Sequence, residues 1–270
     1  MSPARQDNPQ SNNRASRHDP EASIAIRSLA LRLPSGYRVD PHEHDWPQLI
    51  HATDGVMTVD TEEGSWVIPS RRAAWVPGGV THGIEATGRV LMRTLYVRPD
   101  LAGQLPSHCS VMSVSPLLRE LVLEVVRRGF LDESVVEQAR LGAVVLDQLR
   151  ETPEVPLDLA WPRDPRARRI ADRVRADPAS QQTLESLAVG SGASPRTLER
   201  LFQRETGVTF GRWRQRARLL DALRRLASGE PVITTAIAVG YDSPSAFIAM
   251  FKRNLGKTPS RYFNDPPATP

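Results

Sequence analysis

Two arginines at helical spacing are the side chains of this sequence best suited to recognise a nucleic acid. Arg196 and Arg200 lie four residues apart in SPRTLERLFQRETGVTFG, residues 194–211. In a helix this spacing places both guanidinium groups on one face. Either group can donate a bidentate pair of hydrogen bonds to O6 and N7 of guanine, which discriminates between bases by about 1–3 kcal/mol. The spacing therefore predicts a helix face that reads base edges.

This segment has a second copy 49 positions later, SPSAFIAMFKRNLGKTPS, in which most of the charge is missing. In each copy an alanine and a glycine four residues apart precede a Ser-Pro pair. A small residue lets two helices cross closely, glycine adopts the turn conformation, and Ser-Pro begins a helix. Each copy thus predicts a helix-turn-helix unit. The matching positions are Ala188 and Ala236, Gly192 and Gly240, Ser194 and Ser243, Phe202 and Phe251, Gly207 and Gly256, and Thr209 and Thr258.

The residues between the copies, GRWRQRARLLDALRRLASGEP, predict a long amphipathic helix. Two reading units joined by such a helix can enter successive major grooves, roughly 34 Å apart. Residues 163–263 hold 19 Arg or Lys against 9 Asp or Glu, whereas the remaining chain holds 16 against 22. This basic block favours a polyanionic partner. The residues expected to be buried along the connecting helix are Trp213, Leu219, Leu220, Leu223 and Leu226.

The C-terminal third of the chain resembles the DNA-binding domain of the AraC/XylS family of transcription regulators. The resemblance covers residues 164–263 and rests on SPRTLERLFQRETG, RARLLDAL and GYDSPSAFIAMFKRNLGKTPSRYF. It implies an all-α domain of seven helices, with helix-turn-helix motifs at about 183–204 and 231–254 joined by a long helix. It also implies a one-component regulator that binds double-stranded promoter DNA and responds to a small-molecule effector, with RNA polymerase as a candidate partner.

The two predicted reading helices differ in their chemistry. The first offers arginines, and its Glu199 can accept a hydrogen bond from cytosine N4 or pair with a neighbouring arginine. The second offers Ala246 and Ala249, so we expect it to add affinity more than sequence information. Phosphate contacts or solvated charge are expected for Arg204, Arg212, Arg214 and Arg216. The DNA-binding candidates are Ser194, Arg196, Thr197, Arg200, Arg204, Ser243, Ser245, Lys252 and Arg253.

Residues 23–98 alternate apolar and polar side chains over short runs, interrupted by turn signals such as Asp54-Gly55. This period predicts a compact antiparallel sheet. Within it GYRVDPHEHDWPQLIHATDG and PGGVTH resemble the two signature motifs of the cupin barrel, with Gln48 in place of the usual glutamate and the final asparagine absent. The fold expected is therefore β then α: an antiparallel cupin-like β-barrel and two helices, followed by the helical domain.

The cupin resemblance implies that His42, His44 and His82 project into one mouth of the barrel. Three imidazoles in that geometry can hold a divalent transition metal such as Zn, Fe, Ni or Mn, or they are hydrogen-bonded pocket lining. With metal, a dioxygenase or isomerase is the alternative function, with Gln48 as a weak neutral fourth ligand. No paired acid and base lie near the motif, so we expect no catalytic residues and favour a sensor.

As a sensor, the barrel would bind an effector between aromatic walls and an anion-binding guanidinium. The same aromatic side chains can instead serve packing alone. The candidate effector-binding residues are Trp46, Gln48, His51, Trp75, Arg93 and Tyr96.

From Pro116 the apolar period becomes helical, with Ser115 and Asp132 as candidate N-caps. The family resemblance implies that the helices after the barrel pair between subunits. We therefore predict a homodimer, with an intramolecular cap over the sheet as the alternative. The boundaries expected are 1–22 for a disordered leader, 23–110 for the sensor domain, 111–152 for the helical dimerisation segment, 153–163 for a Pro-rich linker, 164–264 for the DNA-binding domain and 265–270 for a tail.

The sequence also predicts a cellular location. It contains no run of about 18 apolar residues, and its first twenty or so residues lack the apolar middle of a signal peptide. These features predict a cytoplasmic protein. Cys109 is the only cysteine, which excludes an internal disulfide and a cysteine-based zinc site.

Overall fold

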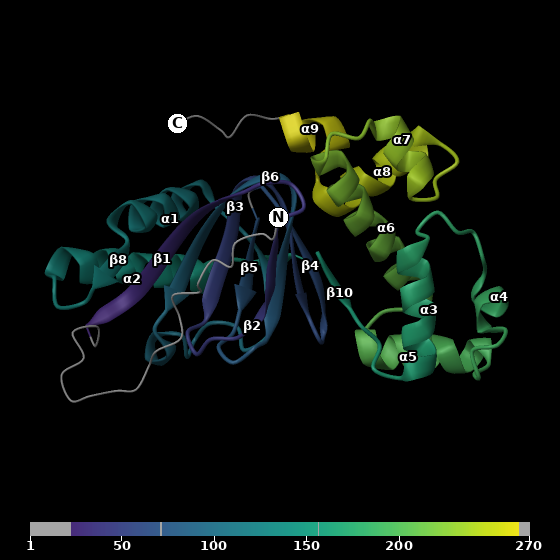
Figure 1. The fold of residues 1–270 in the computed structure, drawn as a ribbon, viewed down its shortest axis with the longest axis horizontal. Coiled ribbons are helices and arrows are strands. Elements are labelled where there is room, and N and C mark those ends of the chain that lie inside the picture. Colours follow the sequence, from purple (N-terminus) through teal and green to yellow (C-terminus); the bar gives the residue numbers. More distant parts are fainter. Residues whose placement is uncertain (1–22, 71, 156, 265–270) are drawn as a thin grey trace, which may run out of the picture.

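The computed structural model describes residues 23–70, 72–155 and 157–264, which form an antiparallel sheet domain followed by an all-helical domain (Figure 1). The expected leader and tail lie outside the described residues. The strands are β1 (Ile24–Leu33), β2 (Arg38–His42), β3 (Gln48–Thr61), β4 (Gly64–Pro69), β5 (Arg72–Val76), β6 (His82–Val97), β7 (Ser110–Ser113), β8 (Phe130–Asp132), β9 (Glu154–Val155) and β10 (Asp158–Ala160). The helices are η1 (Pro99–Leu101), α1 (Pro116–Arg128), α2 (Val136–Glu151), α3 (Pro165–Ala176), α4 (Leu184–Ala188), α5 (Pro195–Thr206), α6 (Phe210–Ala227), α7 (Val232–Ala238), α8 (Pro244–Leu255) and α9 (Pro259–Asn264).

The described strands form one antiparallel sheet in the order β8-β1-β6-β3-β5-β7-β9, with β2 paired to β6 and β4 paired to β3 and β10. This confirms the antiparallel sheet predicted from the period of two. The predicted turn at Asp54-Gly55 is wrong, because the pair lies inside the long strand β3, where the register with β6 shifts. Gly55 has φ +79°, and a Cβ there would lie 2.4 Å from the backbone oxygen of Arg89. The glycine therefore serves a bulge and not a hairpin.

Side chains alternate between the two faces of the sheet. On the outer face, Leu49, Trp75 and Leu95 pack into one core with Leu118 of α1 and Val145 of α2. The intramolecular cap over the sheet is therefore present. On the inner face the buried side chains belong to a second core, which continues into the helical domain.

The starts of α1 and α2 confirm one of the two predicted N-caps and contradict the other. The hydroxyl oxygen of Ser115 accepts a hydrogen bond from the backbone N–H of Leu118 at 3.0 Å, which confirms Ser115 as the N-cap of α1. Asp132 as an N-cap is wrong, since α2 begins at Val136. Asp132 ends strand β8, and its carboxylate accepts from the backbone N–H of Ser134 at 2.8 Å.

Helices α3 to α9 form the helical domain, with α6 connecting its two halves (Figure 1). The helices α3, α4 and α5 lie at one end of α6, and α7, α8 and α9 at the other. Trp213, Leu219, Leu220 and Leu223 are buried along α6 as predicted, whereas Leu226 is only partly buried. These features confirm two helix-turn-helix motifs joined by a long helix.

The segment expected as a linker, residues 153–163, contributes strands to the sheet. Strand β9 pairs with β7, and β10 pairs with β4. Trp213 donates from its indole Nε1 to the backbone oxygen of Ala160 at 2.8 Å, and Arg224 donates from Nε to the hydroxyl of Thr58 at 3.1 Å. The sheet and the helical domain are therefore joined by packing and hydrogen bonds as well as by the chain.

The two turn glycines differ in what surrounds them. Gly192 and Gly240 both have left-handed φ, at +81° and +80°. A Cβ on Gly192 would only touch the side chain of Arg166 at 3.9 Å, whereas on Gly240 it would lie 2.9 Å from the backbone oxygen of Ala179. Only the second turn is closely packed against backbone.

Substitution of these glycines by alanine is expected to destabilise the protein unequally. The left-handed conformation costs roughly 1–2 kcal/mol at either position. Gly240→Ala should cost about 1–3 kcal/mol more, because overpacking adds to the strain. Urea denaturation of both variants measures the difference. If Gly192→Ala and Gly240→Ala lost the same free energy of unfolding, this would contradict the close packing of the turn at Gly240.

Among the described residues, no helix combines the length and apolar character needed to cross a bilayer.

Candidate functional site

The first helix-turn-helix motif consists of α4, the turn at Gly192 and α5. Helix α5 begins where the hydroxyl oxygen of Ser194 accepts from the backbone N–H of Thr197 at 3.2 Å. Leu198 and Phe202 are buried on its inner face. The opposite face is exposed to solvent and carries Arg196, Arg200 and Arg204.

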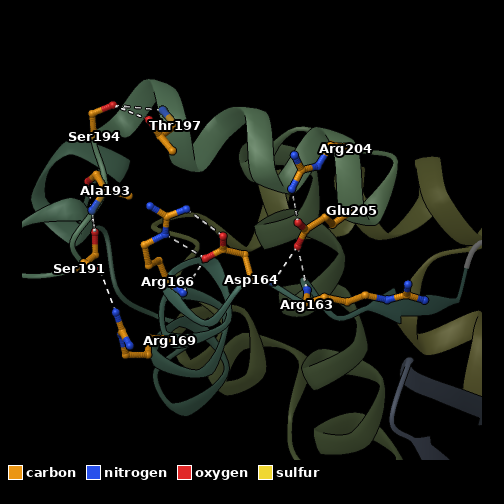
Figure 2. A network of polar contacts seen from close by, with 10 residues as sticks. All are labelled: Arg163, Asp164, Arg166, Arg169, Ser191, Ala193, Ser194, Thr197, Arg204 and Glu205. Atoms are coloured by element: carbon orange, nitrogen blue, oxygen red, sulfur yellow. Dashed lines mark hydrogen bonds and ion pairs between the residues drawn. The ribbon is translucent and has the colours of Figure 1, made fainter.

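A polar network holds this motif against α3 (Figure 2). Arg169 donates from Nη2 to the backbone oxygen of Ser191 at 2.8 Å, which fixes the turn. The carboxylate of Glu205, at the end of α5, accepts from the backbone N–H groups of Arg163 and Asp164 at 2.8 and 2.9 Å. These contacts fix the direction in which the exposed face of α5 points.

The predicted base-reading side chains differ in the contacts they already make. The hydroxyls of Ser194 and Thr197 lie 2.9 Å apart, so each already has a hydrogen-bond partner. Arg204 donates to the carboxylate of Glu205 at 2.6 Å. Arg196 and Arg200 are exposed on the outer face of α5.

Glu199 has a role that the sequence did not suggest. Its carboxylate accepts a hydrogen bond from the backbone N–H of Phe210 at 3.2 Å, at the first residue of α6. This contact satisfies one of the N–H groups that a helix leaves unpaired at its start. One oxygen of Glu199 therefore caps α6, and pairing with cytosine stays a prediction.

The second motif consists of α7, the turn at Gly240 and α8. Helix α8 begins at Pro244 as expected, but the Ser243 hydroxyl makes no capping hydrogen bond. The exposed residues on α8 or at its start include Ser243, Ser245, Ala246, Ala249, Lys252, Arg253 and Asn254. Small side chains therefore occupy the start of its exposed face.

Two further cations lie beside the end of α8. Lys257 and Arg261 line a hollow of about 380 Å³ together with Lys252. Lys257 and Arg261 were not among the DNA-binding candidates predicted from the sequence. Their signal was the run GKTPSR, which follows the second reading helix directly.

The three predicted metal ligands come together at one end of the sheet. One ring nitrogen from each of His42, His44 and His82 lies within 4.8 Å of the others. The side-chain oxygen of Gln48 lies 3.1 Å from Nε2 of His44 and 3.0 Å from Nε2 of His82. The amide nitrogen of Gln48 donates to the hydroxyl of Thr94 at 2.8 Å, which fixes the orientation of the amide.

Two atoms of this cluster, Nε2 of His82 and the side-chain oxygen of Gln48, direct lone pairs at each other. His82 donates from Nδ1 to the backbone oxygen of Val80, and burial lowers its pKa to about 4, so its neutral ring has a bare Nε2. That nitrogen faces the oxygen of Gln48. His44 Nδ1 is buried without a hydrogen-bond partner in the described part of the chain. Imidazole nitrogens and an amide oxygen that converge in this way fit a divalent transition metal.

The six predicted effector-binding residues divide between the faces of the sheet. Gln48 lies opposite Tyr96 in the register of β3 and β6, and the Tyr96 ring centroid lies 5.1 Å from that of His44. The guanidinium of Arg27 lies over the ring of Trp46, with Cζ 4.4 Å from the ring centroid. Arg27 is the register partner of Tyr96 on β1, so these residues share the histidine face.

A single pocket formed by all six residues is therefore wrong. His51 lies opposite Arg93 in the pairing of β3 with β6. His51 is three residues after Gln48, and successive side chains of a strand point to opposite faces, so His51 and Arg93 lie on the outer face of the sheet. Trp75 is buried there against α1 and donates its indole N–H to the backbone oxygen of Pro106 at 2.8 Å. Arg27 places a cation on the histidine face, which the strand register reveals.

His51 is a buried titratable group outside the histidine cluster. Its Nδ1 donates to the backbone oxygen of Arg72 at 2.8 Å, while its Nε2 is buried without a hydrogen-bond partner in the described residues. Burial lowers the pKa of His51 to about 4, and the charges of Arg119 and Arg93 act in the same direction. The imidazole is therefore neutral in the folded protein at neutral pH.

Acidification is expected to destabilise the protein through His51. Its pKa is lower in the folded state than the ordinary value of 6.5, so stability falls as the pH drops from about 6.5 to about 4. Between pH 7 and pH 5 this loss is about 2 kcal/mol. His51→Asn retains a donor for the Arg72 oxygen but does not titrate, so it should lose about 2 kcal/mol less over the same interval. Urea denaturation at both pH values measures this. An identical pH dependence in the two proteins would contradict a neutral buried His51.

Together, the fold and its sites define a class of protein: a ligand-binding sheet domain joined to a domain with two helix-turn-helix motifs. Comparison with family models agrees. Residues 33–188 match the AraC-like ligand binding domain, and residues 187–265 match a helix-turn-helix domain. The chain belongs to the AraC family of transcriptional regulators.

Individual relatives are regulators of the same arrangement. The HTH-type transcriptional regulator NimR of Escherichia coli strain K12 is 36% identical over 221 residues, covering 82% of this chain and 81% of NimR. The HTH-type transcriptional activator RhaS of Escherichia coli O139:H28 is 27% identical, covering 88% of this chain and 91% of RhaS. The crystal structure of ToxT from Vibrio cholerae O395 is 14% identical and covers 88% of this chain and 97% of its own, with a TM-score of 0.38. NimR and RhaS are transcriptional regulators and not enzymes, so the enzyme alternative has no support.

Proposed function

We propose that this AraC-family regulator reads promoter DNA mainly through α5 and clamps it through α8. The observation that carries this proposal is the contrast between the exposed faces of the two helices. Arg196 and Arg200 are exposed on α5, whereas Ala246 and Ala249 are exposed on α8 beside Lys252. Guanidinium groups read guanine, while small side chains and phosphate contacts supply affinity with little sequence information.

Footprinting of the DNA upstream of its own gene and of neighbouring genes tests this proposal. We expect two protected stretches about one helical turn apart, because the reading helices lie at opposite ends of α6 (Figure 1). Base substitutions should weaken binding strongly in the stretch read by α5 and weakly in the other. Equal sensitivity in both stretches would contradict the division between the helices.

The effector site that we propose lies on the histidine face of the sheet. His42, His44 and His82, with Gln48, would hold a divalent transition metal, which as a Lewis acid would bind an oxygen or nitrogen atom of the effector. Trp46 and Tyr96 would contact the rest of the molecule. The observation that supports this site is the convergence of ring nitrogens and an amide oxygen described above.

His44→Ala is expected to weaken zinc binding at least about tenfold, because it removes one ligand of the cluster. Zinc titration of apo-protein by calorimetry measures this, and elemental analysis of the untreated protein gives the metal content. His108→Ala is the matched control, since His108 is an exposed histidine paired with Glu154 at 3.1 Å. Equal zinc binding by both variants, or none by the unsubstituted protein, would leave the histidines as pocket lining.

We also propose that the protein forms a homodimer in the cytoplasm and contacts RNA polymerase there. Leu117 and Val136, on the two helices that cover the sheet, are 53% and 56% exposed. Exposed apolar side chains on neighbouring helices favour a protein partner. Sedimentation equilibrium should give twice the monomer mass, and Val136→Glu should lower it towards that of the monomer. A monomer at all concentrations would contradict the dimer.

A further inference from the structure

The loop between α3 and α4, residues 177–183, belongs to the first half of the helical domain but contacts the second helix-turn-helix motif. Gln181 donates from Nε2 to the backbone oxygen of Gly240 at 2.8 Å. A Cβ on Gly240 would lie 2.9 Å from the backbone oxygen of Ala179, so this α3–α4 loop and the second turn meet backbone to backbone. The two motifs are therefore connected at a second place besides helix α6.

An arginine of α6 holds the α3–α4 loop in this position. Arg218 donates from Nε to the backbone oxygen of Pro178 and from Nη2 to that of Ser180, both at 2.9 Å. Its Cζ lies 6.0 Å from the ring centroid of Tyr241, the residue that follows the glycine of the second turn. A guanidinium has its N–H donors in a fixed planar arrangement, so it can hold two carbonyls in one orientation. Arg218 thus joins α6, the α3–α4 loop and the second motif.

The α3–α4 loop is also connected to the first motif. Helix α3, which precedes the loop, is bound to the first turn through Arg169 and to the end of α5 through Glu205. Arg214 of α6 donates to the backbone oxygen of Gln182 in the loop at 2.7 Å. Because α5 and α8 are linked both by α6 and by this second path, a rotation of one relative to the other would break the loop contacts.

We propose that the α3–α4 loop fixes the relative orientation of the two reading helices, and with it the spacing of the two DNA stretches that the protein accepts. Gln181 and Arg218 are the positioning residues. One additional base pair between two stretches of DNA moves the second by roughly 3.4 Å and rotates it by about 35° around the duplex axis. Helices held in one arrangement therefore enter both grooves at one spacing only. This inference rests on the proposed function, in which α5 and α8 both contact DNA.

Mobility-shift titrations test this on the promoter site and on copies with one base pair inserted or deleted between the two protected stretches. For the unsubstituted protein we expect the altered spacing to weaken binding at least about tenfold, since α8 loses its groove. Gln181→Ala and Arg218→Gln should each reduce this spacing penalty about 2- to 10-fold, the equivalent of one hydrogen bond. Arg218→Lys keeps the charge and can still donate to one carbonyl, so its penalty should lie between those of the unsubstituted protein and Arg218→Gln.

Gln182→Ala is the matched control for Gln181→Ala. The Gln182 side chain accepts from Arg173 of α3 at 3.4 Å and makes no contact with the second motif, so the full spacing penalty should remain. A variant that is merely destabilised binds all three DNAs more weakly by the same factor. The ratio of affinities at the two spacings therefore separates positioning from stability.

A second measurement needs no DNA. Nitroxide labels on Gln203→Cys and Asn254→Cys, in protein that carries Cys109→Ser, report the distance between α5 and α8 by double electron–electron resonance. Both labelled positions are exposed. We expect one narrow distance distribution with the native loop and a broader one when Gln181→Ala is added, because the helices are then free to turn.

An unchanged spacing penalty in both Gln181→Ala and Arg218→Gln would overturn the proposal, and so would equal affinity of the unsubstituted protein for all three DNAs. Protection of a single stretch of DNA would instead contradict the proposed function. In that case a broader distance distribution in Gln181→Ala would still support the α3–α4 loop as the link between the helices, and an unchanged distribution would overturn it.

Discussion

Trp213→Ala is expected to lower the free energy of unfolding by about 3–5 kcal/mol, the range for removal of a large buried aromatic side chain. Trp213 is 1% exposed, and its ring centroid lies 5.4 Å from that of Phe202 on α5 and 6.0 Å from that of Trp161 beside β10. Its indole N–H donates to the backbone oxygen of Ala160. The substitution therefore opens a cavity and leaves the partly buried carbonyl of Ala160 without its donor.

Urea denaturation followed by circular dichroism measures this loss. Trp213→Phe is the matched variant, because it keeps an aromatic ring but removes the N–H donor, and it should cost about 1–3 kcal/mol. The first helix-turn-helix motif packs on this residue, so specific DNA binding should weaken with stability in the alanine variant. A loss below about 1 kcal/mol in Trp213→Ala would contradict its place in the shared core.

Arg200→Ala is expected to weaken binding to the specific promoter site by about 1–3 kcal/mol, roughly 5- to 150-fold, while binding to unrelated DNA changes little. Arg200 lies on the exposed face of α5, opposite the buried Leu198 and Phe202. A side chain in this position approaches a base edge when the helix enters the major groove. Its loss removes sequence information more than general electrostatic attraction.

Arg212→Ala is the control for this prediction, because Arg212 is equally exposed but lies in the first turn of α6 and not on a reading helix. We expect it to weaken binding to both DNAs and to reduce the slope of log affinity against log salt by about 1. Mobility-shift titrations on both DNAs at several salt concentrations distinguish the variants. An equal loss on both DNAs in Arg200→Ala would remove the assignment of base reading.

Local features of the helices could be predicted from the sequence because they depend on neighbouring residues. The caps at Ser115 and Ser194 need only a serine before the first turn of a helix. The turn at Gly192 needs only a residue that tolerates left-handed φ. The helix-turn-helix repeat and its exposed arginines follow from the same short-range rules.

Other features depend on residues far apart in the chain. Glu199 caps α6 because the fold brings the start of that helix to its carboxylate. The segment expected as a linker forms strands that pair with β4 and β7. Nothing in the sequence of the segment itself indicates these distant strands as its partners. A cavity lined by Arg72 and Lys257 exists only because the helical domain packs beside the sheet.

The sequence alone determined the antiparallel sheet and the two helix-turn-helix motifs, since each depends on residue types at short, fixed spacing. Resemblance to known families supplied the family and the meeting of His42, His44 and His82, which are far apart in the chain. Only the tertiary structure decided which of the candidate effector-binding residues lie on the histidine face. His51, Trp75 and Arg93 belong to the opposite side of the sheet from Gln48 and Tyr96. A shift of one residue in a strand moves a side chain to the other face, so strand register, set by long-range pairing, decides which predicted residues can meet one ligand.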